Sequence, residues 1–161
     1  MKKTFLLIIT LLIILLFANR QLAYAEPHGI ISIPCLKIEM PFYTASNKTE
    51  QAVIDDEQSA LYYQWQNAYR IVDHAFSTDE SGNEWNIQKI FSGSYVIVEF
   101  NGHKYFYECY LTAKTEYKYD QEFYNGRLLT PCSSYDILLS CCAEDSNHHF
   151  VAVFRRLSEF K

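Results

Sequence analysis

The chain has 161 residues, of which 16% are aromatic, and its formal net charge at pH 7 is −5. Lys and Arg do not cluster in this acidic sequence, so it lacks the basic face that binds nucleic-acid phosphates or an anionic membrane surface. Its 13 Tyr and 11 Phe, together with many Ile and Val, favour β-strands over helices. We therefore expect a mainly β protein with no nucleic-acid partner.

The first 25 residues have the features of an export signal. Lys2 and Lys3 form a short basic segment, residues 5–18 are almost wholly apolar, and Ala23-Tyr24-Ala25 supplies the small residues of a cleavage site. The apolar run of about 14 residues is shorter than the roughly 20 that span a bilayer. Cleavage after residue 25 and retention as an N-terminal membrane tether both remain open. In either case we expect an exported protein, secreted or membrane-associated outside the cytoplasm.

Residues 26–161 have the size of one domain with one hydrophobic core. Residues 1–25 carry three positive charges and no acids, so removing them takes the net charge from −5 to −8. We therefore predict a signal peptide or anchor over 1–25 and a single acidic domain over 26–161.

The first half of this domain contains short predicted elements. A strand over 29–34 ends at a proline, and alternating apolar and polar side chains predict a second strand over 36–43. Residues 44–57 are polar and are predicted to form a loop with a helical turn. A short strand follows over 69–74, and residues 84–90 are predicted to form a helix of one to two turns. Many short strands with few helices are typical of a barrel or a sandwich.

A β-hairpin opens the second half of the domain. Asn101-Gly102 is a favoured two-residue turn between strands over 95–100 and 103–111. A connection of about 20 residues follows, in which no strand is predicted and whose acids, Glu122 among them, are expected to lie on a solvated face. The last two predicted strands are 136–141 and 149–157.

One cysteine and one histidine stand out as candidates for chemistry. Five cysteines in an exported chain leave at least one thiol without an intrachain disulfide partner. Cys141 ends a predicted strand next to a polar loop, and His74 ends another short strand. A thiolate and an imidazolium brought together by the fold support acyl transfer from a peptide carbonyl. The structural alternative is a buried Cys and a hydrogen-bonded His.

Four motifs occur in a fixed order after the N-terminal signal. They are Gly-x-Ile-x-Ile-Pro at 29–34, Ile-Val-x-His at 71–74, Gly-x-Tyr-Val-Ile-Val at 93–98 and Leu-x-Ser-Cys at 138–141. This arrangement resembles the sortases, cysteine transpeptidases of Gram-positive surfaces, over nearly all of the mature chain. The resemblance implies a closed eight-stranded sortase-type β-barrel with short helices.

The resemblance also implies roles for three residues and a class of substrate. Cys141 matches the family's nucleophile, His74 its histidine, and Ser140 the hydroxyl residue before the nucleophile, which we assign to substrate binding. The implied substrate is the sorting-signal peptide of a surface protein or pilin, cleaved at a Thr–Gly-type bond. Its acyl end would pass to an amine of peptidoglycan or of a pilin subunit. No cofactor and no metal are implied, and the cysteine spacings do not match a structural zinc site.

Two positions depart from the sortase pattern. Asp73 stands where the family usually has Gly, and the family's Arg at the start of the last strand falls here on His148 or His149. That Arg stabilises the oxyanion, and losing one oxyanion donor costs on the order of 10²–10³ in rate. We predict His149 as the replacement and Arg127, in the long connection, as a further candidate for substrate binding. The alternative function is a non-catalytic sortase-like module that binds a peptide or a protein.

The adjacent cysteine leaves a second assignment open. In a strand, Cys141 and Cys142 point to opposite faces, so one should face the substrate and the other should not. The motif match favours Cys141. Cys35 and Cys132 each follow a proline, and a disulfide between them remains open. The third interpretation is a disulfide-stabilised secreted domain whose likeness to sortases is architectural only.

Overall fold

The computed structural model describes residues 27–44, 60–75, 77–119, 121–143 and 147–160. The predicted export signal and nearly all of the predicted loop over 44–57 lie outside these residues, so both stay predictions. Within the described ranges, no helix is both long enough and apolar enough to cross a membrane.

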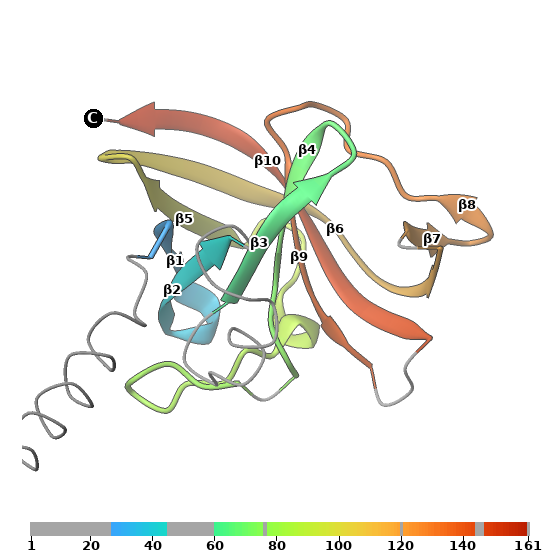
Figure 1. The fold of residues 1–161 in the computed structure, drawn as a ribbon, viewed down its shortest axis with the longest axis horizontal. Coiled ribbons are helices and arrows are strands. Elements are labelled where there is room, and N and C mark those ends of the chain that lie inside the picture. The colour runs from blue at the N-terminus through green and yellow to red at the C-terminus, as the bar shows by residue number, and fades with distance from the viewer. Residues whose placement is uncertain (1–26, 45–59, 76, 120, 144–146, 161) are drawn as a thin grey trace, which may run out of the picture.

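Ten strands in the described ranges form one continuous sheet that closes on itself (Figure 1). They are β1 (Gly29–Ile33), β2 (Ile38–Thr44), β3 (Ala60–Trp65), β4 (Ala68–Val72), β5 (Tyr95–Phe100), β6 (His103–Lys118), β7 (Gln121–Tyr124), β8 (Arg127–Leu128), β9 (Ile137–Cys142) and β10 (His148–Phe160). The order is β10-β9-β4-β3-β2-β1-β5-β6, and pairing of β10 with β6 closes these eight strands into a barrel. β7 and β8 extend from β6 beside the barrel. The predicted closed eight-stranded barrel is confirmed.

Apolar side chains from every barrel strand fill the interior. One member from each strand, in chain order, is Ile31, Met40, Ala60, Ile71, Val96, Tyr107, Leu139 and Phe154. Trp85 and Ile87 join this interior core from the connection between β4 and β5 and are almost fully buried. Each fully buried large apolar side chain contributes roughly 1.5–3 kcal/mol. The interior core therefore holds in place the strands that carry the candidate site.

Gly29 marks a close approach between three strands. β1 pairs with both β2 and β5, and Gly29 lies opposite Phe42 on one side and Phe100 on the other. A Cβ at Gly29 would overlap the carbonyl oxygen of Glu99 and the ring of Phe42. We expect Gly29→Ala to lower the free energy of unfolding by about 1–3 kcal/mol, because the added methyl group forces the neighbouring backbone to shift. Urea unfolding measures this, with Ser32→Ala in the same strand as control; equal effects of the two substitutions would contradict the expectation.

The predicted hairpin is confirmed. β5 and β6 pair from Phe100 opposite His103, and the two turn residues, Asn101 and Gly102, have φ values of 51° and 74°. Positive φ at both central residues is what the favoured type I′ turn requires.

The connection after the hairpin was predicted wrongly. β6 does not end at residue 111 but continues to Lys118, and β7 and β8 follow before the chain returns to β9. β6 pairs with β10 along most of its length, and β10 itself continues to Phe160. A long partner strand supplies backbone hydrogen bonds to a polar segment whose local sequence alone does not predict a strand.

The segment before the hairpin also differs from expectation. Instead of a helix over 84–90, the structure has a single 3₁₀ turn, η2 (Ile87–Lys89). Glu84 forms an isolated β-bridge with Thr78, and the Trp85 amide donates to the Ser77 carbonyl at 2.7 Å. These residues are thus paired with the preceding loop, outside any helix.

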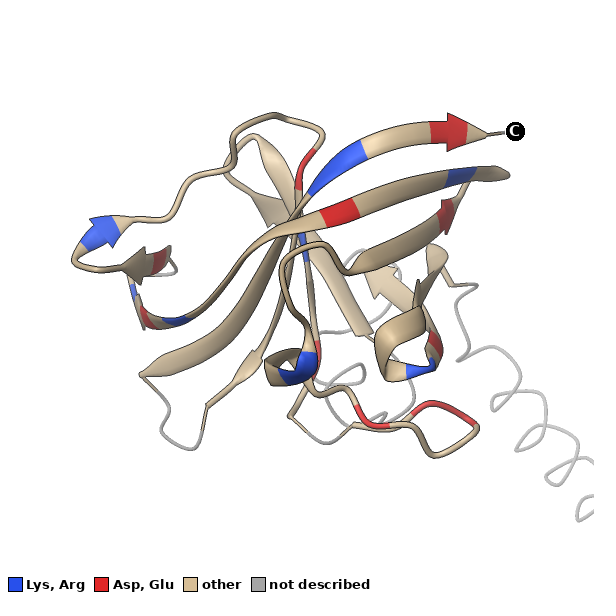
Figure 2. Cartoon of the chain, turned by 180° about the vertical axis from the view of Figure 1, so that it is seen from behind, with Lys and Arg blue, Asp and Glu red and all other residues tan. Residues whose placement is uncertain are grey.

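Charged side chains are interspersed over the described surface. Figure 2 shows Lys and Arg alternating with Asp and Glu along the long strands. Arg155 of β10 pairs with Glu108 of β6 at 2.6 Å, and Lys104 pairs with Glu99 at 3.0 Å. The described strands β6 and β10 therefore carry residues of both charges.

Candidate functional site

The two adjacent thiols at the end of β9 point to opposite faces of the barrel wall. Leu139 and Cys141 belong to the interior core. Leu138 belongs to a second apolar cluster on the outer face, and Cys142 shares its strand parity. Cys142 is exposed, whereas Cys141 is buried. The strand therefore presents Cys142, not Cys141, to molecules outside the barrel.

Cys141, the predicted nucleophile, is only 3% exposed. It lies opposite Phe150 of β10 and accepts a backbone hydrogen bond from Ile87. Burial raises the pKa of Cys141 to about 11, with smaller contributions from Cys142 and Asp73. At that pKa, about one thiol in 10⁴ is ionised at pH 7. The interior position thus disfavours the thiolate that a nucleophile requires.

Cys142 lies directly opposite His149 across the β9–β10 pair. A hydrogen bond with His149 lowers the pKa of Cys142 despite partial burial, and the charge of Arg70 acts in the same direction. Burial works to lower the pKa of His149, but its hydrogen bonds with Cys142 and Glu122 raise it above the ordinary value. The two shifts favour a thiolate beside an imidazolium, which is the form in which a Cys/His pair reacts.

Glu122 of β7 holds the imidazole of His149. Its Oε1 atom lies 2.6 Å from Nδ1 of His149 and 2.6 Å from Nη2 of Arg70, while Oε2 accepts a 2.6 Å hydrogen bond from Thr115. Burial works to raise the pKa of Glu122, but the hydrogen bonds from His149 and Thr115 and the charge of Arg70 hold it below its usual range. Glu122 is fully buried, so the prediction that it lies on a solvated face was wrong.

Arg70 of β4 connects this cluster to the barrel wall. Only 3% of its side chain is exposed, and Nε donates to the Ser140 hydroxyl at 2.9 Å. The guanidinium lies over the ring of Tyr117, 5.5 Å from its centroid, and that ring packs 4.4 Å from the ring of His149. Ser140, predicted to bind substrate, is fully buried, and its hydroxyl is bonded to Arg70.

His74, the predicted acid and base, follows β4 and is exposed. β4 and β9 run parallel with Val72 beside Ser140, so His74 lies near the end of β9 that carries both cysteines. Its backbone amide donates to the Asp73 carboxylate at 2.7 Å. Among the described residues, no hydrogen bond joins the His74 side chain to Cys141. The structure thus brings His149, not His74, into contact with a thiol.

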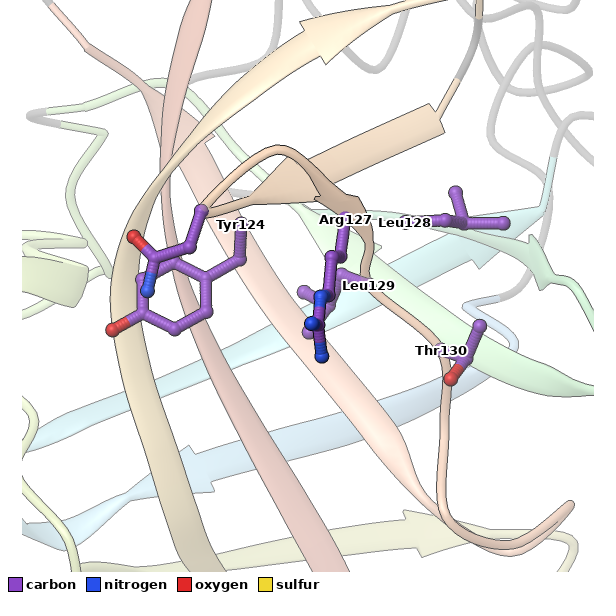
Figure 3. Close-up of a pocket in the computed structure, with 6 residues that line it drawn as sticks. Tyr124, Arg127, Leu128, Leu129 and Thr130 are labelled. Carbon is purple, nitrogen blue, oxygen red and sulfur yellow. The ribbon is translucent and has the colours of Figure 1, made fainter.

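Arg127 lies outside this cluster. It is exposed in β8 and lines a small surface pocket with Tyr124, Leu129 and Thr130 (Figure 3). The pocket lies along the turn between β7 and β8 and the segment that follows it. Within the described ranges, no contact links Arg127 to either cysteine.

The sequence analysis missed Arg70 and identified no role for Glu122. Arg70 lies in a short, mainly apolar strand, on the same face as His74 by strand alternation. A charged residue in such a strand needs a partner if it is buried. That signal could have identified Arg70 as a paired cation. Its partner was not predictable, because Glu122 is 52 positions away, in a strand that was not predicted.

A larger cavity of about 610 Å³ opens at the opposite end of β9. Its lining includes the aromatic side chains of Tyr62, Tyr107 and Tyr135, and also Arg156. Ile137, the first residue of β9, also lines it. Ile71 of β4, which lies beside Leu139, lines it too, so the cavity extends along the interior face of the wall toward the end of β9 that carries Cys141. In the described part of the chain, no group of three His, Cys, Asp or Glu side chains is arranged to hold a metal ion.

No protein-family model matches the chain, and no curated protein sequence matches it either. Among solved structures, it is similar to sortase E1 from Streptomyces coelicolor, solved with a tripeptide in the active site. The identity is 14%, the match covers 83% of this chain and 90% of that one, and the TM-score is 0.63. SrtA sortase from Actinomyces oris is 15% identical over 85% and 83% of the two chains, with a TM-score of 0.63. Sortase A from Listeria monocytogenes is 14% identical over 83% and 88%, with a TM-score of 0.58. The chain has the sortase fold, as the order of its motifs predicted.

Proposed function

We propose that this protein is a cysteine-dependent acyltransferase of the sortase type, with Cys142 as nucleophile and His149 as acid and base. The observation that carries the proposal is the hydrogen bond between an exposed thiol and a histidine on the neighbouring strand, which lowers the pKa of Cys142. The barrel fold supports it, because similar barrels are sortases. The proposed nucleophile lies at the end of β9, next to the cysteine of the Leu-x-Ser-Cys motif.

The proposed reaction has two steps. The Cys142 thiolate attacks a peptide carbonyl, and the imidazolium of His149 gives its proton to the leaving amine as the C–N bond breaks. The product is a thioester on Cys142 and a neutral imidazole. An acceptor amine then attacks the thioester carbonyl, its proton passes to His149, and the C–S bond breaks to restore the thiolate. The result is a new amide, with no cofactor and no net redox change.

The proposed substrate follows from the sortase resemblance. It is the sorting-signal peptide of a surface protein or pilin, and the acceptor is an amine of peptidoglycan or of a pilin subunit. The similar sortase E1 was solved with a tripeptide in its active site, which supports a peptide as the acyl donor. The proposed location is outside the cytoplasm, secreted or tethered through the N-terminal segment, where such substrates occur.

The assignment of Cys142 departs from the sequence-based prediction of Cys141 and His74. Cys141 would need to leave the interior core, or substrate would need to enter the barrel, before the thiol could react. An exposed His74 remains available as an additional proton carrier at the same end of the barrel. The second candidate function is a non-catalytic sortase-like module that binds a peptide or protein. The burial of Cys141, the cysteine that matches the sortase motif, favours this function if Cys142 is not the nucleophile.

Trapping the acyl-enzyme tests the proposal. The mature protein is mixed with a peptide that contains a Thr–Gly bond, quenched in acid, digested and mapped by mass spectrometry. We expect a thioester adduct on Cys142, and its yield should fall when an amine acceptor such as glycinamide is added. An adduct on Cys141 would contradict the choice of nucleophile. A folded protein that binds the peptide but forms no adduct would identify the binding module instead.

A further inference from the structure

We propose that Glu122, held by Arg70, is a positioning residue that fixes the orientation and charge of His149 and thereby keeps Cys142 in its thiolate form. The inference rests on the proposed partnership of Cys142 and His149. It adds to the cysteine and histidine a buried acid and a buried arginine from two other strands, β7 and β4.

The first argument is the position of the proton on the imidazole. Nδ1 of His149 lies 2.6 Å from Oε1 of Glu122, a length typical of a charge-assisted hydrogen bond. Arg70 Nη2 lies 3.0 Å from the same Nδ1, but its contact with Glu122 Oε1 is shorter, at 2.6 Å. The carboxylate oxygen therefore accepts from both groups, and Nδ1 keeps its proton. Nε2 is left as the ring nitrogen that exchanges a proton with the thiol or with substrate.

The second argument is that Glu122 cannot turn away. Its side chain is fully buried, and Oε2 is held by the Thr115 hydroxyl at 2.6 Å. The same hydroxyl lies 3.3 Å from the backbone carbonyl of His149. Both carboxylate oxygens are thus bonded to fixed groups on neighbouring strands. A carboxylate held in this way fixes the orientation of the His149 imidazole before any substrate binds.

The third argument concerns charge. A buried carboxylate without a cation takes up a proton and loses its effect on a neighbour. Together with the hydrogen bonds from His149 and Thr115, Arg70 supplies a permanent cation that keeps Glu122 ionised. Arg70, Glu122, His149 and Cys142 then form a row in which positive and negative groups alternate, so each charge has an opposite neighbour.

Among the described residues, groups from four strands face the imidazole and act on its charge in both directions. Glu122 from β7 and Cys142 from β9 raise the pKa of His149, while burial and the charge of Arg70 from β4 lower it; the balance is a raised value. From β6, the ring of Tyr117 packs 4.4 Å from the imidazole. The lowered pKa of the thiol and the raised pKa of the imidazolium both favour the charged pair, and the two groups titrate as a unit.

The test is the pH profile of Cys142 alkylation by iodoacetamide, followed by peptide mapping. In the unmodified protein we expect half-maximal reactivity well below the ordinary cysteine pKa of about 8.5. Glu122→Gln removes the charge but keeps the shape, and it should move the profile upward by about one pH unit or more. Glu122→Asp keeps the charge and should recover part of that change. Glu116→Gln, an exposed acid on the neighbouring strand β6, is the matched control and should leave the profile in place.

Two results would overturn the proposal. One is a folded Glu122→Gln protein with an unchanged alkylation profile; the other is an unmodified protein whose Cys142 reacts like an ordinary thiol. A second measurement covers the case in which Glu122→Gln does not fold. The His149 ring protons of the unmodified protein are titrated by NMR, and a midpoint at or below the ordinary histidine value of about 6.5 would also refute the role of Glu122. Neither measurement uses a peptide substrate, so each can fail independently of the proposed acyl transfer.

Discussion

Cys142→Ala should abolish acyl transfer, with a fall in turnover of about 10³-fold or more, because the nucleophile is removed. Cys141→Ala should leave turnover within a few-fold of the unmodified protein, since Cys141 faces the interior core. Its expected effect is on stability, a loss of roughly 1–2 kcal/mol for the small cavity that remains. Cleavage of a fluorogenic Thr–Gly peptide measures turnover, and urea unfolding measures stability.

The two substitutions control for each other. Both remove a sulfur atom from neighbouring residues of β9, and they differ in the face of the barrel wall to which the thiol points. Loss of turnover in a folded Cys141→Ala protein, with activity kept in Cys142→Ala, would reverse the assignment in favour of the sequence motif. His149→Gln should reproduce most of the loss in Cys142→Ala, because the two residues act as one unit.

Arg70→Leu should destabilise the fold by about 3–5 kcal/mol at neutral pH. The substitution removes the permanent cation of the fully buried carboxylate of Glu122 and leaves His149 as its one charged partner in the cluster, and breaking one side of a buried pair costs about that much. Arg155→Leu is the matched control, because Arg155 also pairs with a glutamate at 2.6 Å but is exposed. We expect a much smaller effect there, since solvent screens exposed pairs. Equal losses of stability in the two variants would contradict the role of the buried pair.

The pH dependence of the Arg70→Leu defect follows from Glu122. In the unmodified protein the pKa of Glu122 is below its unfolded value, so its contribution to stability is present above about pH 4.3 and is lost as the pH falls through the folded pKa. Without Arg70, the pKa of Glu122 should rise, because only His149 and Thr115 then oppose the effect of burial. The defect should therefore be larger at pH 7 than at pH 4.5. The double substitution Arg70→Leu with Glu122→Leu should recover much of the loss, because no unpaired charge remains. Urea unfolding at the two pH values checks both expectations.

Local patterns predicted the parts of the fold that depend on near neighbours. The Asn101-Gly102 hairpin was correct because two adjacent residues with positive φ determine the turn. The extension of β6 to Lys118 was missed because its strand form depends on β10, more than 30 residues further along. The turn Ile87–Lys89 replaced a longer predicted helix because Trp85 and Glu84 bond to the loop before them.

In the candidate site, too, local patterns predicted only the features that depend on near neighbours. Alternation along β9 was enough to predict that Cys141 and Cys142 face opposite ways. Which of them is buried depends on how β9 lies between β4 and β10 and on the segment around Ile87 that covers the barrel interior. His149 was singled out by its place in the last strand, yet its contacts with Cys142 and Glu122 give it a role different from the predicted oxyanion donor.

By itself, the sequence determined a β-rich chain with two adjacent thiols at the end of a strand and a motif order that predicted the sortase fold. Strand periodicity and turn chemistry are local, so they can be read from neighbouring residues. Only the tertiary structure decided that Cys142 faces outward and that Arg70, Glu122 and His149 meet beside it. These four residues come from four separate strands, and a buried charge is tolerated only where the fold brings its partner within bonding distance.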